Sequence, residues 1–291
     1  MATEDHIRNP LEWGWDQIKL AGTAISSTGH AVAGPGEGVD TTPPVVRRIE
    51  IADLKEVLAK GFADFGAYRT DVFFVCLIYP VAGLFLINLA FGYDMLPLLF
   101  PLASGFTLIG PIAAVGLYEM SRRREKGFEV TWSDAFAVTG SPAFGAIMVL
   151  GLVLLTIFVV WMAVAQIIYD MTLGPKPPVS IEAFVNDVVT TSAGWAMVIV
   201  GMGTGFLFAV LVLAISVVSF PLLLDRNVGV YTAVETSIRA VMKNPEPMAV
   251  WGLIVAGGLV IGMLPVFIGL VIILPVLGHA TWHLYRKVVA S

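Results

Sequence analysis

The chain has 291 residues, of which 57% are hydrophobic and only 13% are charged, and its formal net charge is −5. Soluble domains usually carry about a quarter charged residues, so this composition excludes an ordinary water-soluble globule and favours a protein of the lipid bilayer. The negative net charge, without a long run of Lys or Arg, argues against nucleic acid as a partner. The single cysteine, Cys76, excludes an internal disulfide and a multi-cysteine metal site.

The first 45 residues differ in composition from the rest of the chain. They are rich in Gly, Thr, Ser and Pro, which predicts a largely disordered cytoplasmic tail with room for one short amphipathic helix. Residues 46–291 form the predicted membrane domain. No apolar core follows the polar N-terminus, so we expect no cleaved signal peptide and a first span that acts as an uncleaved signal.

Five stretches without Asp, Glu, Lys or Arg are long enough to cross a bilayer, which takes about 20 residues. They are residues 72–90, 96–118, 143–168, 196–224 and 248–285. The last has room for two helices, and Pro265 lies where a tight hairpin would divide it. The sequence therefore predicts an all-α membrane protein of about six transmembrane helices arranged as three hairpins. A re-entrant hairpin at the end, leaving four spans, is the alternative.

Basic residues fall almost wholly on one side of this six-span frame. Cytoplasmic loops retain Lys and Arg, and all 17 of these residues except Lys176 lie in the N-terminal region, the second and fourth loops and the C-terminal tail. This asymmetry predicts a multi-pass protein of the bacterial inner membrane with both termini in the cytoplasm.

Three segments that each precede a predicted hairpin have the period of an amphipathic helix. Their apolar stripes are Leu54, Leu58, Phe62 and Phe65; Trp132 and Phe136; and Tyr231, Val234, Ile238 and Val241. The charged face of the first contains Asp53, Lys55, Glu56, Lys60 and Asp64. A surface helix followed by a helical hairpin therefore occurs three times, which indicates a weak internal repeat.

One sizeable loop is predicted on the outer side, between the third and fourth spans. Apolar residues recur in it at helical spacing from Ile181 to Val189, and Ser180 is placed to cap that helix. We expect the helix to lie on the periplasmic membrane surface.

His279 and His283 are the candidate ligands for a metal ion or a haem. They lie four residues apart near the inner end of the predicted sixth span, so they share one helix face. Two imidazoles at this spacing can bind a metal ion or haem iron, but the predicted spans offer no cysteine pair or carboxylate to complete a metal site. We favour the alternative, in which both histidines cap the interface by hydrogen bonds to backbone or lipid headgroups and no cofactor is bound.

Charged side chains at the inner membrane edge form a second candidate site. Glu119 follows the second span, with Arg122 and Arg123 close behind it. Asp225 and Arg226 follow the fourth span. We expect these residues to form an ionic cluster that ties the hairpins together, with a ligand-binding or catalytic role as the alternative.

Four motifs occur in order between about residues 50 and 288. They are residues 110–123 (GPIAAVGLYEMSRR), 190–195 (TTSAGW), 219–226 (SFPLLLDR) and 277–286 (LGHATWHLYR). Through them the chain resembles a bacterial family of predicted integral membrane proteins of unknown function, some of whose members are labelled putative cytochrome c oxidase components. Two membrane histidines on one helix and one cysteine cannot hold the haems and copper of an oxidase core. The resemblance therefore implies at most an accessory or assembly role.

Three functions stay open on the sequence. The absence of known catalytic motifs and the small-residue pairs Gly201–Gly205 and Gly258–Gly262 favour a non-enzymatic accessory or assembly component of a larger, respiratory or other, membrane complex. A transporter or channel is the second reading, and a haem- or metal-binding membrane protein the third. Polar residues in the predicted spans motivate the second: Asn88, Ser104, Thr107, Gln166 and Ser216. No ionisable residue lies at a predicted membrane centre, which lowers the expectation of a proton-coupled pump.

Overall fold

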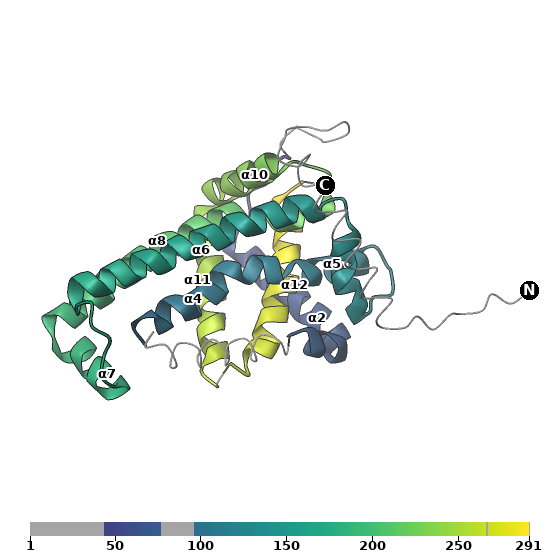
Figure 1. Cartoon of the computed structure of the whole chain (residues 1–291). Helices are drawn as coiled ribbons and strands as arrows, with labels where there is room; N and C mark the ends of the chain where they lie inside the picture. Colours follow the sequence, from purple (N-terminus) through teal and green to yellow (C-terminus); the bar gives the residue numbers. More distant parts are fainter. Residues whose placement is uncertain (1–43, 77–95, 266, 291) are drawn as a thin grey trace, which may run out of the picture.

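The computed structural model describes residues 44–76, 96–265 and 267–290, and within these ranges the protein is helical (Figure 1). The elements are α2 (Ile51–Cys76), the 3₁₀ helix η1 (Leu96–Leu98), α4 (Leu99–Ala113), α5 (Val115–Glu125), the 3₁₀ helix η2 (Trp132–Gly140), α6 (Phe144–Thr172), α7 (Ile181–Thr190), α8 (Ser192–Ser216), α9 (Ser219–Asp225), α10 (Val230–Lys243), α11 (Pro245–Met263) and α12 (Leu270–Val288). In the described part of the chain the β pairing is an isolated antiparallel bridge between Val46 and Val289. The predicted disordered tail, up to residue 43, and most of the predicted first span lie outside these ranges.

Helix α12 lies at the centre of the fold and packs most extensively against α2. Their backbones approach closely at Gly61, where a Cβ atom would come within 2.7 Å of the Ala280 Cβ and of the Val276 carbonyl oxygen. Helix α5 approaches α12 in the same way, since a Cβ on Gly278 would lie 2.5 Å from Leu117. Small residues thus allow three helices to meet where longer side chains would hold them apart.

Helices α6 and α8 form a long hairpin that extends away from the other helices, with α7 at its far end (Figure 1). The two helices contact each other through Trp161 and Phe208, whose ring centroids are 5.3 Å apart, and through Gly205, which faces Trp161. Large apolar side chains stay exposed around the hairpin, among them Leu152, Val159, Ile199, Phe206 and Leu207. Apolar surface of this extent is expected where lipid is the solvent.

Three helices in the described ranges are long and apolar enough to cross a membrane: Phe144–Thr172, Ser192–Asp225 and Pro245–Met263. Six spans were expected. The predicted second span is divided at Ala114, three residues after Pro111, so that neither α4 nor α5 reaches spanning length. Pro111 removes a backbone donor within α4 and disturbs the turn before it, but the boundary at Ala114 lies after that turn and has no such explanation. The predicted sixth span, α12, ends in Arg286 and Lys287 and buries most of its side chains in protein.

The long apolar stretch at the C-terminus is divided as predicted. Helix α11 ends at Met263 and α12 begins at Leu270, so Pro265 lies in the connection. A Cβ built on Gly269 would come 2.8 Å from the Gly262 Cα, which shows how closely the two helices approach at this turn.

The predicted surface helices form with different faces buried from those expected. Helix α2 runs without a break from Ile51 to Cys76, and it buries Leu54, Val57, Gly61 and Asp64 while Phe62 is exposed. Placing Asp64 on the solvent face was therefore wrong, because the close approach at Gly61 turns that side of α2 towards α12. The segment before α6 is the 3₁₀ helix η2. Helix α7 forms as predicted, and its Ser180 cap accepts a hydrogen bond from the Ala183 amide at 3.1 Å.

Substituting Gly61 with Ala is expected to destabilise the protein by about 2 kcal/mol, because overpacking a close helix contact forces the backbones apart. Gly66→Ala is the matched control: it lies on the same helix with nothing within 4 Å of an added Cβ, so better helix propensity should leave stability equal or slightly higher. Thermal unfolding of both variants in detergent measures the difference. Equal melting temperatures for the two would show that the α2–α12 contact is not tight.

Candidate functional site: a buried polar cluster between α2, α5 and α12

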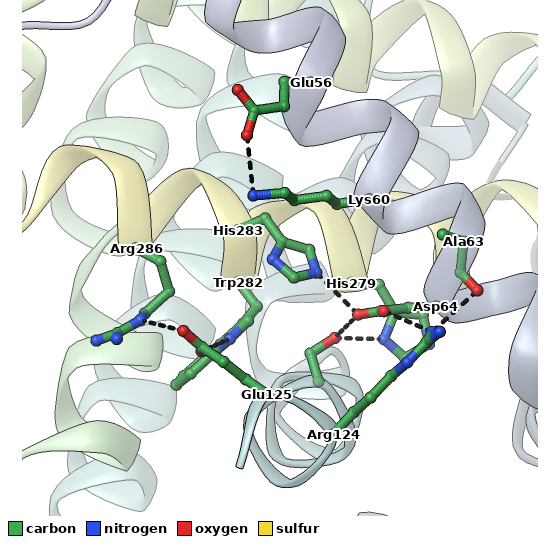
Figure 2. A network of polar contacts seen from close by, with 11 residues as sticks. Glu56, Lys60, Ala63, Asp64, Arg124, Glu125, His279, Trp282, His283 and Arg286 are labelled. Carbon is green, nitrogen blue, oxygen red and sulfur yellow. Dashed lines mark hydrogen bonds and ion pairs between the residues drawn. The ribbon is translucent and has the colours of Figure 1, made fainter. Parts of the chain in front are cut away.

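Five polar side chains from three helices meet at one buried point (Figure 2). We call them the Asp64 cluster. Helix α2 contributes Asp64, α5 contributes Ser121 and Arg124 on adjacent turns, and α12 contributes His279 and His283. The spacings of three and four residues place each pair on one helix face. The two candidate histidines therefore lie on one face of α12 and in the same cluster.

Asp64 is the centre of the cluster and accepts from three side chains. Its Oδ1 accepts from the Arg124 guanidinium at 2.7 Å, and its Oδ2 accepts from the Ser121 hydroxyl at 2.6 Å and from His283 Nε2 at 2.9 Å. Arg124 also donates to the Ala63 carbonyl oxygen at 3.0 Å. A carboxylate that is only 5% exposed is thus surrounded by donors.

The pKa of Asp64 is lowered from its ordinary value of 3.8. Burial acts in the opposite direction, but hydrogen bonds from His283 and Ser121 and the nearby histidine charges outweigh it. Asp64 is therefore ionised at neutral pH and carries the negative charge that Arg124 balances.

His279 is fully buried, and its ring lies against Ser121 and the Leu117 backbone. Its Nδ1 lies 2.8 Å from the Ser121 hydroxyl oxygen. Since that hydroxyl has a single hydrogen and donates it to Asp64, Nδ1 is the donor to the Ser121 oxygen. The other nitrogen, Nε2, is then a bare acceptor, and it has no hydrogen-bond partner in the described part of the structure.

This order of residues does not form a nucleophilic triad. In a triad the histidine lies between the serine and the carboxylate and accepts the serine proton. Here Ser121 lies between Asp64 and His279 and gives its proton to the carboxylate. Ser121 as a whole is only 1% exposed, so a substrate cannot reach its hydroxyl oxygen. The arrangement ties three helices together.

The two histidines do not converge on a common point for a metal ion. His283 is engaged by Asp64 and His279 by Ser121, and the described residues contain no group of three or more His, Cys, Asp or Glu side chains that suits a metal. Both form bonds to side chains of other helices.

The predicted inner-edge cluster is divided into two groups on either side of α5. In the first, Glu119 pairs with Arg122 at 2.7 Å and with Arg123 at 2.8 Å, and Arg123 reaches Asp134 of η2 at 2.6 Å. Glu119 is 3% exposed. This group connects α5 to η2.

The second group connects the end of α9 to α12. Asp225 accepts from the Tyr285 hydroxyl at 2.8 Å and from Arg286 at 3.4 Å, and Arg286 also reaches Glu125 at 3.0 Å. Arg226 donates to the Ala290 carbonyl oxygen. The candidate site residues expected from the sequence did not include several members of these networks, among them Asp64, Ser121, Glu125, Asp134, Tyr285 and Arg286. Arg286 and Glu125 lie 161 positions apart, so no local pattern indicated that they meet.

Replacing Asp64 with Asn is expected to lower stability by about 2 kcal/mol and the melting temperature by about 5 °C, because Arg124 and His283 lose their common counter-charge. Asp53→Asn is the matched control on the same helix: its bond to Lys287 joins two partly exposed groups, and such pairs contribute less than about 1 kcal/mol. Thermal unfolding of the purified protein in detergent measures both.

The stability gap should also depend on pH. Because the pKa of folded Asp64 lies below 3.8, its contribution is complete above that unfolded-state value and is lost as the pH falls through the folded-state pKa. The wild type and Asp64→Asn should therefore converge at acidic pH. A gap that is absent at pH 7 would contradict the role given to this carboxylate.

Comparison with known proteins places one part of the chain. A family model described as "Predicted integral membrane protein (DUF2189)" matches residues 99–225, from α4 to α9. No curated protein and no solved structure matches the chain. The matched stretch contains Ser121 and Arg124 of the Asp64 cluster and two of the three candidate spans. Over this stretch the chain is similar to a family of predicted integral membrane proteins of unknown function.

Proposed function

We propose that this protein is a multi-pass component of a bacterial inner membrane that acts as an accessory or assembly partner of a larger membrane complex. The observation that carries the proposal is the α6–α8 hairpin, which extends beyond the central helices (Figure 1). Apolar side chains are exposed on both of its helices. Only 28% of the most apolar window of α6 is buried within the protein. Such a hairpin offers a long surface to neighbouring helices in the bilayer.

The polar groups near the other end of the hairpin support a structural role. Glu119, Asp64 and Asp225 are each bonded to two or more side chains of the protein. The bonds of Asp64 and Asp225 stabilise contacts between helices, whereas Glu119 pairs within α5 and is linked to η2 through Arg123. Stable contacts between helices are what a scaffold for partner subunits requires.

The transporter or channel alternative has less support. Polar side chains in the described spans bond within their own helices: Gln166 to Asp170, Thr156 to the Leu152 carbonyl and Ser216 to the Val212 carbonyl. A conduction path would instead need such groups aligned along a common cavity. Asn88 and the side chains of Ser104 and Thr107 lie outside the described part of the structure.

The haem- or metal-binding alternative is supported by one atom, the bare Nε2 of His279. An absorption spectrum of the purified protein tests it: a Soret band would favour haem, and its absence would remove that proposal. Elemental analysis answers the same question for a bound metal.

Purification in mild detergent followed by mass spectrometry tests the accessory role. We expect a stoichiometric companion that is lost when Phe206 and Leu207, which are 66% and 67% exposed on α8, are both replaced by Ala. The matched control replaces Leu253 and Val260, exposed on α11, and should retain the companion. Recovery of a lone monomer from the wild type would contradict the proposal.

Reporter fusions test the proposed orientation, with both termini in the cytoplasm and α7 outside. Green fluorescent protein fused after Ser291 should fluoresce, and alkaline phosphatase inserted at the exposed turn near Lys176 should be active. Active phosphatase at the C-terminus would reverse the topology and contradict the six-span arrangement.

A further inference from the structure

Helix α10 buries its small residues, packs part of its valines against the core and leaves two large side chains exposed. Its buried face consists of Thr232, Ala233, Thr236, Ser237 and Ala240. That face bonds to the junction of α8 and α9, where the Ser219 hydroxyl donates to the Ala233 carbonyl at 3.1 Å and the Ser237 hydroxyl accepts from the Val218 amide at 3.2 Å. The opposite face carries Tyr231 and Met242, which are 79% and 75% exposed.

The exposure of Tyr231 and Met242 departs from the pattern of a helix on a soluble protein, where the large apolar side chains face the core. The predicted stripe that includes Val234, Ile238 and Val241 is only half buried. Helix α10 also connects the candidate spans Ser192–Asp225 and Pro245–Met263, so it lies where the chain leaves the bilayer and enters it again. An outward apolar face at this level is solvated by acyl chains.

Basic side chains border that face and line a hollow on the surface. The hollow is formed by Pro44, Val45, Val46, Arg239, Met242 and Lys243. The Lys243 ammonium donates to the Val46 carbonyl at 2.8 Å, which leaves two of its hydrogens for a ligand. Arg239 uses one guanidinium nitrogen to bond Glu235 at 2.6 Å, which leaves its other guanidinium donors for a ligand.

The charges near the hollow favour an anion. Arg47 and Arg48 follow directly on the segment that lines it, and both are exposed. The acidic residues adjacent in sequence to these elements are Glu235, already paired with Arg239, together with Glu50 and Glu246. Four cations thus stand beside a surface whose apolar members, Val45 and Met242, are 69% and 75% exposed.

We propose that this hollow binds an anionic glycerophospholipid of the inner leaflet. Arg239 and Lys243 contact the phosphate, and an acyl chain lies along Met242 and Val45. A cationic pair four residues apart on one helix, beside an apolar face at the membrane boundary, recognises both parts of such a lipid at once. A zwitterionic lipid matches the apolar surface but brings no net negative charge to the two cations.

Native mass spectrometry of the full-length protein in detergent tests this proposal, with dioleoyl phosphatidylglycerol and dioleoyl phosphatidylcholine as the probes. The wild type should retain phosphatidylglycerol in preference to phosphatidylcholine. The double variant Arg239→Gln with Lys243→Gln should bind it about thirtyfold more weakly, since two cations near an anionic headgroup are lost. Binding of phosphatidylcholine should be the same in this variant as in the wild type.

The matched control, Lys126→Gln with Lys176→Gln, removes the same charge from exposed positions away from α10 and should bind like the wild type. Folding of each variant is checked by its melting temperature, which should stay close to wild type because the substituted groups lie on the surface. Equal retention of the two lipids by the wild type, or equal binding by the two double variants, would overturn the proposal. Neither result would bear on the accessory role, which depends on α8.

Discussion

The contact between α2 and α12 is the constraint on which the rest of the described structure depends. Gly61 removes the side chain that would separate the two backbones, and the short distance that results brings the Asp64 carboxylate into contact with α12 and α5. A buried carboxylate is costly unless it is fully bonded. Once α2 and α12 approach, Ser121, Arg124 and His283 must therefore occupy defined positions, and the register of all three helices follows.

Polar clusters stabilise the central helices of this fold, whereas apolar packing stabilises the α6–α8 hairpin. Charged networks connect α2, α5, α9 and α12 near one end of the molecule, where each carboxylate finds donors from more than one residue. The α6–α8 hairpin has few such bonds and depends on packing contacts such as that of Trp161 with Gly205. Directional bonds thus define the central helices, and apolar surface, which lipid or another helix can cover, defines the hairpin.

Much of the secondary structure could be predicted from the sequence, because its signals are local. Ser180 caps α7 through a bond to a residue three positions away, and Pro265 divides α11 from α12 within the chain itself. The burial of Asp64 could not be predicted in this way, since its partners lie 57 and 219 positions distant. The periodicity of α10 indicated an amphipathic helix, but periodicity alone does not say that its small residues, Ala233 and Ala240, face the protein. Three further predicted spans depend on segments that are interrupted, buried or outside the described residues.

The bridge between Val46 and Val289 has a consequence for the two ends of the chain. The Arg47 amide donates to the Val288 carbonyl at 2.7 Å and the Ala290 amide donates to the Val45 carbonyl at 2.9 Å, so the entry to α2 and the exit from α12 are stapled together. The chain therefore enters α2 and leaves α12 side by side. A force on one of these two segments is transmitted to the other through a few backbone hydrogen bonds, without passing through the helices in between.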